Sequence, residues 1–305
     1  MIAKLERIML IVNPHSGHGK SIDILPYVDR YLTDMGAKVD IRITEHPHEA
    51  SRIAYMAARC GYKKVVAMGG NGTVNSVGSG LLGSDSTLAI IPAGFRNDYF
   101  RMLDIGKNLK EICKAVVFGD EALFDVGMIN SQPFFNTMGI GFDAEVAINA
   151  NKNNKNFGKL IYFMTILKTL KRLPAFDIKL RIDNLDLTYR LVLVTVGIGR
   201  SSGGGFLLTP QAIANDGKFD VCILEKIDRS KMFSTLIKML KGTHIRKPEV
   251  KIFRCKQIEV FSDKPLPVHY EGETLINKRG KIVIQMSAEK IKVAVKPKKE
   301  LVNEI

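Results

Sequence analysis

Short apolar runs alternate with longer amphipathic stretches over the first third of the chain. The apolar runs predict strands at Ile8–Val12, Lys38–Thr44, Lys64–Met68 and Thr87–Ile91. The stretches between them predict helices at Ile22–Met35, His48–Cys60 and Val74–Leu82. Strands that alternate with helices of this length indicate βαβ units and a parallel sheet. In such a sheet the loops that leave the carboxyl ends of the strands build the binding crevice.

The pattern changes after about Phe124, where apolar runs separated by turn residues dominate. These runs predict strands at Phe176–Ile182, Leu187–Val196, Phe219–Leu224 and Ile258–Phe261. Such a series is typical of an antiparallel sandwich. Two amphipathic helices are predicted within it, at Leu160–Leu173 and Met232–Leu240.

Two further segments complete the predicted organisation. The run Met286–Val295 predicts a strand that returns to the first domain, and the Asn-rich segment Asn149–Asn156 predicts a flexible loop. We therefore expect an α/β domain formed by residues 1–124 with 288–305, and a β-rich domain formed by residues 125–287.

Composition adds a strong positive charge to this picture. The 305 residues are 46% hydrophobic and carry a formal net charge of +14. Such an excess attracts nucleic acid, anionic lipid or phosphorylated ligands, although charge alone favours a well-solvated basic surface. No nucleic-acid-reading motif is recognisable, so we expect no nucleic-acid partner.

The cysteines and the apolar runs indicate the cellular compartment. The four cysteines are widely spaced, which argues against a zinc site or a disulfide framework and suits a reducing cytosol. The sequence lacks the layout of a signal peptide and has no apolar run long enough to cross a bilayer. We therefore expect a cytoplasmic protein that touches a membrane without spanning it.

The chemically most informative segment is Gly69-Gly70-Asn71-Gly72-Thr73, which joins a predicted strand to a predicted helix. Three glycines in four positions allow a tight turn and bring backbone N–H groups close to a bound anion. The positive end of the following helix adds to the attraction. The segment therefore fits a triphosphate, although a ligand-free turn accounts for a glycine cluster equally well.

Two other loops that follow predicted strands are rich in Gly, Asn and polar side chains. One is Asn13–Lys20 (NPHSGHGK), and the other is Ile91–Arg101 (IPAGFRNDYFR). Taken alone, Asn97 and Asp98 favour a helix cap over a ligand. Because the carboxyl ends of parallel strands meet at one edge of a sheet, the three loops together predict a nucleotide crevice.

The chain resembles the diacylglycerol kinase catalytic-domain family, which includes bacterial lipid kinases and sphingosine and ceramide kinases. The likeness to its nucleotide loops rests on NPHSGHGK (13–20), GGNGTVNSV (69–77) and PAGFRND (92–98). The later segments that match are FNTMGIGFDAEV (135–146), GGGFLLTPQAIANDGKFDV (203–221) and YEGE (270–273). The resemblance implies an N-terminal α/β domain with a mostly parallel sheet, similar to NAD kinases and phosphofructokinases, and a C-terminal β-sandwich.

The resemblance also implies ATP-dependent transfer of a phosphoryl group to a lipid hydroxyl, with diacylglycerol as the default acceptor and Mg²⁺ as the metal. Glu273 matches the family's general base, whereas taken alone it indicates an exposed hairpin residue. Asp216, with main-chain oxygens at Ile213 and Lys218, matches a Mg²⁺ site of bacterial members, and the same segment also favours a turn. The positions that match nucleotide contacts are Asn13, Pro14, His15, Ser16, Gly17, Thr44, Gly69, Gly70, Asn71, Gly72, Thr73, Val74, Asn75, Gly94, Phe95, Asn97 and Asp98.

Several positions depart from the family's usual residues. The Asp of the glycine loop is replaced by Asn71, which keeps the shape but loses the charge that faces the metal of ATP. Phe95 removes a hydroxyl, Arg96 adds a cation, and Glu271 replaces the Asp of the terminal Asp-Gly-Glu motif. Ser76 stands where Glu is usual. Two interpretations remain open, a lipid kinase of reduced activity and a lipid- or nucleotide-binding pseudokinase. An NAD kinase fits less well because its later Thr-Pro-Thr-Gly-Ser type of segment is missing.

A lipid substrate requires contact with a membrane. The predicted helix Leu160–Leu173 combines an apolar face with Lys168, Lys171 and Arg172, as interfacial helices do. A helix that packs on its own domain with a basic outer face explains the pattern equally well. We expect peripheral contact with an anionic membrane surface at the inner membrane face, and the sequence leaves a homodimer open.

Overall fold

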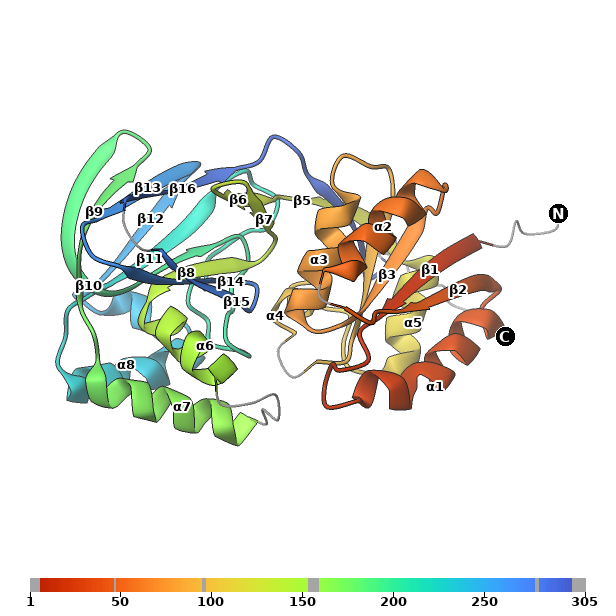
Figure 1. Cartoon of the computed structure of the whole chain (residues 1–305), viewed down its shortest axis with the longest axis horizontal. Helices are drawn as coiled ribbons and strands as arrows, with labels where there is room; N and C mark the ends of the chain where they lie inside the picture. Colours follow the sequence, from red (N-terminus) through yellow and green to blue (C-terminus); the bar gives the residue numbers. More distant parts are fainter. Residues whose placement is uncertain (1–5, 47, 95–96, 153–158, 278–279, 298–305) are drawn as a thin grey trace. The chain divides into compact units, whose positions relative to one another are not determined.

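The computed structural model describes residues 6–46, 48–94, 97–152, 159–277 and 280–297. The chain divides into two compact units (Figure 1). Unit 1 comprises residues 1–124 and 289–305, and unit 2 comprises residues 125–288.

The described residues of unit 1 form a 6-stranded sheet in the order β2-β1-β3-β4-β17-β5. All neighbouring pairs are parallel except β17 with β5, which are antiparallel. The central strand β3 is buried along its whole length, as suits the apolar residues 65–68 in a sheet covered on both faces, and its buried Lys64 donates to the carbonyl of Val117. The strands are β1 (Glu6–Val12), β2 (Ala37–Ile43), β3 (Lys64–Gly69), β4 (Thr87–Pro92), β5 (Asp120–Phe124) and β17 (Ile291–Val295).

Helices cover both faces of this sheet, α2 with α3 on one side and α1 with α5 on the other (Figure 1). Their bounds are α1 (Lys20–Asp34), α2 (Glu49–Arg59), α3 (Asn71–Leu81), α4 (Asp98–Arg101) and α5 (Leu109–Phe118). The close approach of α2 and α3 depends on small residues. A Cβ on Gly80 would lie 2.9 Å from the Cβ of Ala54 and 2.2 Å from the carbonyl oxygen of Ser51.

The predicted return of the chain to unit 1 is confirmed, because β17 pairs with both β4 and β5. The predicted strand Met286–Val295 is nevertheless too long. Met286 ends the preceding strand in unit 2, and the returning strand begins only at Ile291. The polar residues between them connect the two units, which an apolar pattern alone does not reveal.

The described strands of unit 2 are all joined by antiparallel pairs and form an 11-stranded sheet around one apolar core. The long strand β10 pairs with β9 along its first half and with β8 and β11 along its second half. The strands are β6 (Gly127–Ile129), β7 (Gln132–Phe134), β8 (Thr137–Gly141), β9 (Phe176–Ile182), β10 (Leu185–Gly197), β11 (Phe219–Glu225), β12 (Val250–Cys255), β13 (Gln257–Ser262), β14 (Leu266–Tyr270), β15 (Glu273–Asn277) and β16 (Gly280–Met286).

The described α-helices of unit 2 lie together beside its strands (Figure 1). They pack on a second apolar core, to which β10 and β11 contribute Val192 and Leu224. The helices are α6 (Phe142–Lys152), α7 (Lys159–Arg172) and α8 (Arg229–Leu240), and α8 is followed by the 3₁₀ helix η1 (Thr243–Arg246).

The expectation of a loop at Asn149–Asn156 is wrong for its first part, because residues 149–152 continue α6. Phe142, Val146 and Ala150 are buried at intervals of four residues and form the apolar face of α6. The amides of Asn149 and Asn151 donate to Thr169 and Gly272, so the Asn side chains also hold the helix in place. Residues 153–156 of this segment lie outside the described residues. In the described part of the chain, no helix is long and apolar enough to cross a membrane.

Candidate functional site

The three Gly- and Asn-rich loops of unit 1 meet at the carboxyl edge of its parallel sheet. They leave β1, β3 and β4, which are neighbours in the sheet. The N–H of Asn13 donates to the carbonyl of Met68 (3.1 Å), and the N–H of Ala93 donates to the carbonyl of Gly69 (2.9 Å). The side-chain amide of Asn13 also donates to Thr73 Oγ1 (3.1 Å). The structure therefore brings together the loops that sequence reasoning assigned to one crevice.

Close approach of backbones explains the glycines in the second and third loops. A Cβ on Gly94 would lie 2.6 Å from the Cα of Gly70, and a Cβ on Gly69 would lie 2.3 Å from Thr73 Oγ1. Gly70 precedes the first turn of α3, which has no acidic residue. The backbone N–H groups and the helix dipole at this turn thus favour an anion.

The first loop folds back on itself around Asn13. The N–H of His15 donates to Asn13 Oδ1 (3.0 Å), and the N–H of Ser16 donates to the carbonyl of Asn13 (3.2 Å). Gly17 has φ 62°, and a Cβ there would lie 2.1 Å from the carbonyl oxygen of Ala93. Only glycine satisfies both conditions, so this loop is fixed against the third one. Pro14 lies between these hydrogen-bonded residues.

Thr44 lies at the end of β2, beside this loop. Its side chain is buried, and its hydroxyl donates to the carbonyl of Val12 (3.3 Å). Thr44 therefore joins the end of β2 to that of β1, and its hydroxyl is engaged by the protein backbone.

Asn71 and Asp98 join the second loop to the third. The amide of Asn71 donates to Asp98 Oδ2 (3.2 Å), and its oxygen accepts the N–H of Asp98 (2.9 Å). Asp98 is fully buried, and its carboxylate lies 4.0 Å from Arg101. An amide at position 71 therefore serves as the hydrogen-bond donor that a buried carboxylate needs. Phe95 and Arg96 lie outside the described residues.

Two buried amide oxygens point to a ligand with donor groups. Among the described residues of unit 1, the amide oxygens Asn75 Oδ1 and Asn97 Oδ1 have no hydrogen-bond partner. The amide of Asn97 donates to the carbonyl of Gly94 (2.6 Å), which leaves its oxygen as an acceptor. Ribose hydroxyls and the adenine amino group are donors, whereas phosphates suit the N–H groups of the glycine loop. The residues present therefore fit a nucleotide.

In unit 2, Glu271 connects segments that are distant in sequence. Its side chain is buried, and Oε1 accepts the N–H groups of Phe135 (3.1 Å), Asn136 (2.5 Å) and Thr137 (3.3 Å). Asn136 in turn donates its side-chain amide to the carbonyl of Ser201 (3.0 Å). Two segments of the family resemblance, 135–146 and YEGE (270–273), thus meet at one carboxylate, and Asn136 links them to Ser201, two residues before the segment 203–221.

Asp143 and His269 form a second polar pair in this region. Asp143 Oδ2 lies 3.1 Å from His269 Nε2 and accepts a hydrogen bond from Thr195 Oγ1 (3.2 Å). A Cβ on Gly139 would lie 1.9 Å from Asp143 Oδ2. Any larger residue at position 139 would therefore clash with the Asp143 side chain. Sequence reasoning did not single out Asn136, Asp143 or His269. The only available signal was that the first two belong to the quoted segment 135–146.

Glu273 begins β15 and is exposed. It pairs across the hairpin with Tyr270, and Gly272 between them has φ 95°. Its exposed place in the hairpin is the one that its sequence alone indicates, and its role as a general base stays a prediction.

The predicted metal position at Ile213, Asp216 and Lys218 is a turn before β11. Asp216 Oδ2 pairs with Arg254, and Asp216 Oδ1 accepts the N–H of Lys218 (3.1 Å). Both oxygens of the carboxylate are therefore engaged, and the guanidinium supplies the positive charge there. Arg254 also lies 3.6 Å from Asp220, whose carboxyl pKa is raised chiefly by burial. In this arrangement the donor set does not fit a cation.

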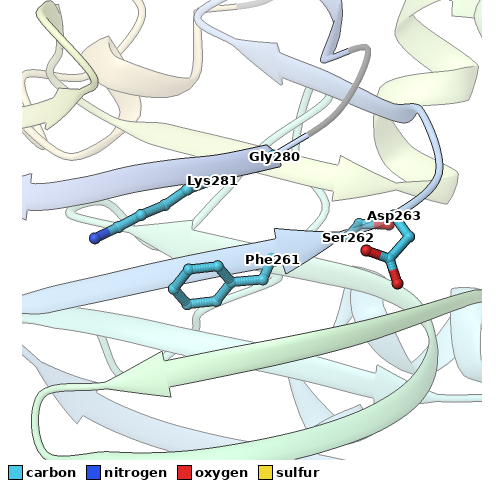
Figure 2. A pocket seen from close by; sticks show the side chains of 5 residues that line it. All are labelled: Phe261, Ser262, Asp263, Gly280 and Lys281. Carbon is cyan, nitrogen blue, oxygen red and sulfur yellow. The ribbon is translucent and has the colours of Figure 1, made fainter.

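A pocket of ≈ 450 Å³ lies away from these loops, where β13 ends and the paired strand β16 begins (Figure 2). Phe261, Ser262, Asp263, Gly280 and Lys281 line it, and none of them is a predicted site residue. Lys281 pairs with Glu259 (2.5 Å) and lies 5.6 Å from the ring centre of Phe261. These partners already satisfy its charge, so we assign no function to the pocket.

The predicted residues fall into two groups. The nucleotide candidates lie in unit 1, whereas Glu273 and the Asp216 turn lie on separate elements of unit 2.

Comparisons with known proteins agree with this organisation. The sequence model of the diacylglycerol kinase catalytic domain matches residues 7–129. The model of the YegS C-terminal NAD kinase beta sandwich-like domain matches residues 136–294. The diacylglycerol kinase of Mycobacterium tuberculosis (strain ATCC 25618 / H37Rv) is 30% identical over 264 residues, which cover 84% of this chain and 85% of the relative. That of Bacillus subtilis (strain 168) is 28% identical and covers 88% of this chain, with 90% of its own length matched.

Solved structures show the same fold. A candidate diacylglycerol kinase from Bacillus anthracis str. Sterne aligns with a TM-score of 0.79 at 26% identity, over 97% of this chain and 99% of that protein. An NAD kinase from Archaeoglobus fulgidus in complex with ATP aligns with a TM-score of 0.54 at 15% identity, over 95% of this chain and 94% of its own, which shows the fold alone. With its α/β unit and its sandwich-like unit each matched, the chain belongs to the diacylglycerol kinase catalytic-domain family of lipid kinases.

Proposed function

We propose that the protein transfers the γ-phosphoryl group of ATP to a hydroxyl of a membrane lipid, with diacylglycerol as the acceptor. The observation that supports this most is the meeting of three loops at one edge of the parallel sheet in unit 1. Their glycine backbone and the start of α3 suit the phosphates, and the buried oxygens of Asn75 and Asn97 suit the ribose or the base.

In the proposed reaction Glu273 takes the proton of the lipid hydroxyl while that oxygen attacks the γ-phosphorus. The bond between the γ-phosphorus and the bridging oxygen breaks, and ADP leaves. The N–H groups of the glycine loop hold the phosphates in position and stabilise their charge. Mg²⁺ bound with ATP would neutralise phosphate charge, and Asp98 and Asn71 are the residues of these loops that would help to hold it.

The decisive experiment is phosphate transfer from labelled ATP to a panel of lipids in mixed micelles. We expect diacylglycerol to be phosphorylated by the wild type, and Glu273→Ala to lower turnover by roughly 10²-fold or more. Nucleotide binding, measured by calorimetry, should stay near the wild-type value in this variant. Full turnover by Glu273→Ala would refute the assigned role of Glu273.

One observation favours a second candidate, a pseudokinase that binds nucleotide or lipid without transfer. Asn71 lacks the charge that the family's usual Asp presents to a metal, and its amide is engaged by Asp98. If the wild type binds ATP and lipid but phosphorylates no lipid of the panel, this second candidate replaces the first.

A further inference from the structure

The helix α8 carries an apolar stripe that its own unit does not cover. Phe233, Ile237 and Leu240 are 47%, 49% and 53% exposed, although each is a large apolar side chain. They follow one another at intervals of four and three residues, so they share one face of the helix. A different face, formed by Met232, Thr235 and Met239, is buried in the core of unit 2.

The neighbouring helix α7 repeats this arrangement. Phe163 and Met164 are 48% and 47% exposed, whereas Ile166 is buried in the same core as Met232 and Met239. The two helices contact each other and lie in one layer of unit 2 (Figure 1). We name their exposed surface the α7–α8 face. Its residues are Phe163, Met164, Lys168, Lys171, Phe233, Ile237, Lys238, Leu240 and Lys241.

The charge of the α7–α8 face has one sign. Neither α7 (KLIYFMTILKTLKR) nor α8 (RSKMFSTLIKML) contains an Asp or Glu. Lys168, Lys171, Lys238 and Lys241 are exposed, and within the described residues none of their side chains forms an ion pair. By contrast, the helices α1 and α2 of unit 1 also expose large apolar residues but carry acidic ones among them.

We propose that the α7–α8 face docks the protein on an anionic lipid surface. Apolar side chains flanked by lysines bind such a surface in two ways: the side chains enter the interface, and the lysines face the anionic headgroups. A second copy of the chain is a poorer partner for this face, because a two-fold dimer would bring the lysines of the two copies together and they would repel each other. A nucleic-acid partner would account for the lysines but not for the exposed apolar side chains of the stripe.

This surface is linked within unit 2 to the strand that carries Glu273. Helix α6 packs against α7 and also contacts β14 and β15. The docking face and the hairpin of Glu273 are therefore connected through α6 within one unit. Docking through α7 and α8 would hold this hairpin in a fixed position relative to the lipid surface. The inference rests in this respect on the proposed function, because it supplies the membrane contact that a lipid acceptor requires.

The test is sedimentation of the full chain with vesicles of phosphatidylglycerol and phosphatidylcholine, without nucleotide. We expect the triple variant Phe233→Ala/Ile237→Ala/Leu240→Ala to lower the partition coefficient roughly 10-fold or more. The double variant Lys238→Glu/Lys241→Glu should lower it by a similar factor, since each lysine near an anionic surface contributes roughly fivefold. Pure phosphatidylcholine vesicles and high salt should weaken wild-type binding.

Matched controls change the same chemistry in unit 1. Tyr27→Ala/Tyr55→Ala/Met56→Ala removes side chains that are 61%, 54% and 52% exposed, and Lys107→Glu/Lys110→Glu reverses two exposed lysines. Both controls should bind vesicles like the wild type. Circular dichroism checks that each variant is folded, and because all substituted side chains are exposed we expect no loss of core packing.

The outcomes separate this inference from the proposed function. Wild-type vesicle binding by both α8 variants overturns the docking face, even if the kinase is active. A dimer in light scattering that the triple variant dissociates, with vesicle binding unchanged, shows a second copy as the occupant and also overturns it. If no lipid is phosphorylated but the α8 variants lose vesicle binding and the controls do not, the proposed function fails and the docking face stands.

Discussion

Asn71 is the residue at which this chain departs most clearly from the Gly-Gly-Asp-Gly-Thr pattern usual in its family. In the structure the side-chain amide of Asn71 makes two hydrogen bonds to the buried Asp98. Its NH₂ group donates to one carboxylate oxygen of Asp98, and its oxygen accepts the backbone N–H of Asp98. A carboxylate at position 71 would keep the acceptor and lose the donor. Two carboxylate oxygens would then face each other where the amide and Asp98 are now 3.2 Å apart.

We predict that Asn71→Asp raises Mg²⁺-ATP-dependent turnover and makes stability depend on Mg²⁺. Without the metal, like charges and the lost hydrogen bond should lower the free energy of unfolding by about 1 to 3 kcal/mol. Added Mg²⁺ should restore the melting temperature of the variant and leave that of the wild type nearly unchanged. Thermal unfolding with and without Mg²⁺, together with the lipid phosphorylation assay, measures both effects.

Asn71→Ala serves as the control, because it removes the amide without adding charge. It should be destabilised to a similar degree and should gain neither turnover nor Mg²⁺-dependent stability. Unchanged nucleotide binding and turnover in Asn71→Asp would contradict the role given to this position in the glycine loop.

At the scale of elements, the turn of the β14–β15 hairpin is anchored by a buried side chain, that of Glu271. Glu271 has φ 50° and Gly272 has φ 95°, so the turn adopts a backbone conformation that L residues rarely favour. The buried carboxylate offsets this cost by accepting three backbone N–H groups from residues 135–137. Glu273 follows two residues later, so its position depends on this anchor.

We predict that Glu271→Gln lowers the turnover number of the kinase more than its affinity for ATP. The amide is a weaker acceptor than the carboxylate, so the hairpin should lose about 1 to 3 kcal/mol of stability and hold Glu273 less firmly. Glu271→Asp, which restores the family's usual residue, should retain more turnover than Glu271→Gln. Steady-state kinetics with urea unfolding of each variant tests this, and equal losses of turnover and ATP affinity would argue against a positioning role.

At the scale of the whole molecule, the chain crosses between the two units more than once. Residues after 288 return to unit 1 as β17, which lies between β4 and β5. Ile291, Val293 and Ala294 are buried there. The sheet of unit 1 is therefore complete only after unit 2 has been synthesised.

We predict that a chain ending at Ala288 fails to fold unit 1. Each large buried apolar side chain contributes about 1.5 to 3 kcal/mol, so losing β17 removes a large part of a total stability of about 5 to 15 kcal/mol. Limited proteolysis should cut within residues 1–124, and ATP binding should be lost. A chain ending at Pro297 keeps β17 and should behave like the full chain, whereas protection of residues 1–124 without β17 would contradict this view.

How far the sequence predicts the structure depends on the distance over which each signal acts. The strand Ile8–Val12 and the helix around Ile22–Met35 were predicted because apolar periodicity is local. The short helix α4 and the edge strand β5 were missed, since Asp98–Arg101 is too short for a periodic signal and β5 is mostly exposed. Helix α6 was missed because its Asn residues mask a narrow apolar face.

The sequence by itself determined the alternation of strands and helices, the glycine loop at Gly69–Gly72 and the family. These follow from residue spacing and backbone freedom within a few neighbouring positions. Only the tertiary structure decided that Asn71 bonds Asp98, 27 residues away, and that Glu271 binds the N–H of Asn136, 135 residues away. It also decided that α7 and α8 leave their apolar stripes uncovered. Such contacts depend on which strands and helices become neighbours, and that is set by the packing of the complete chain.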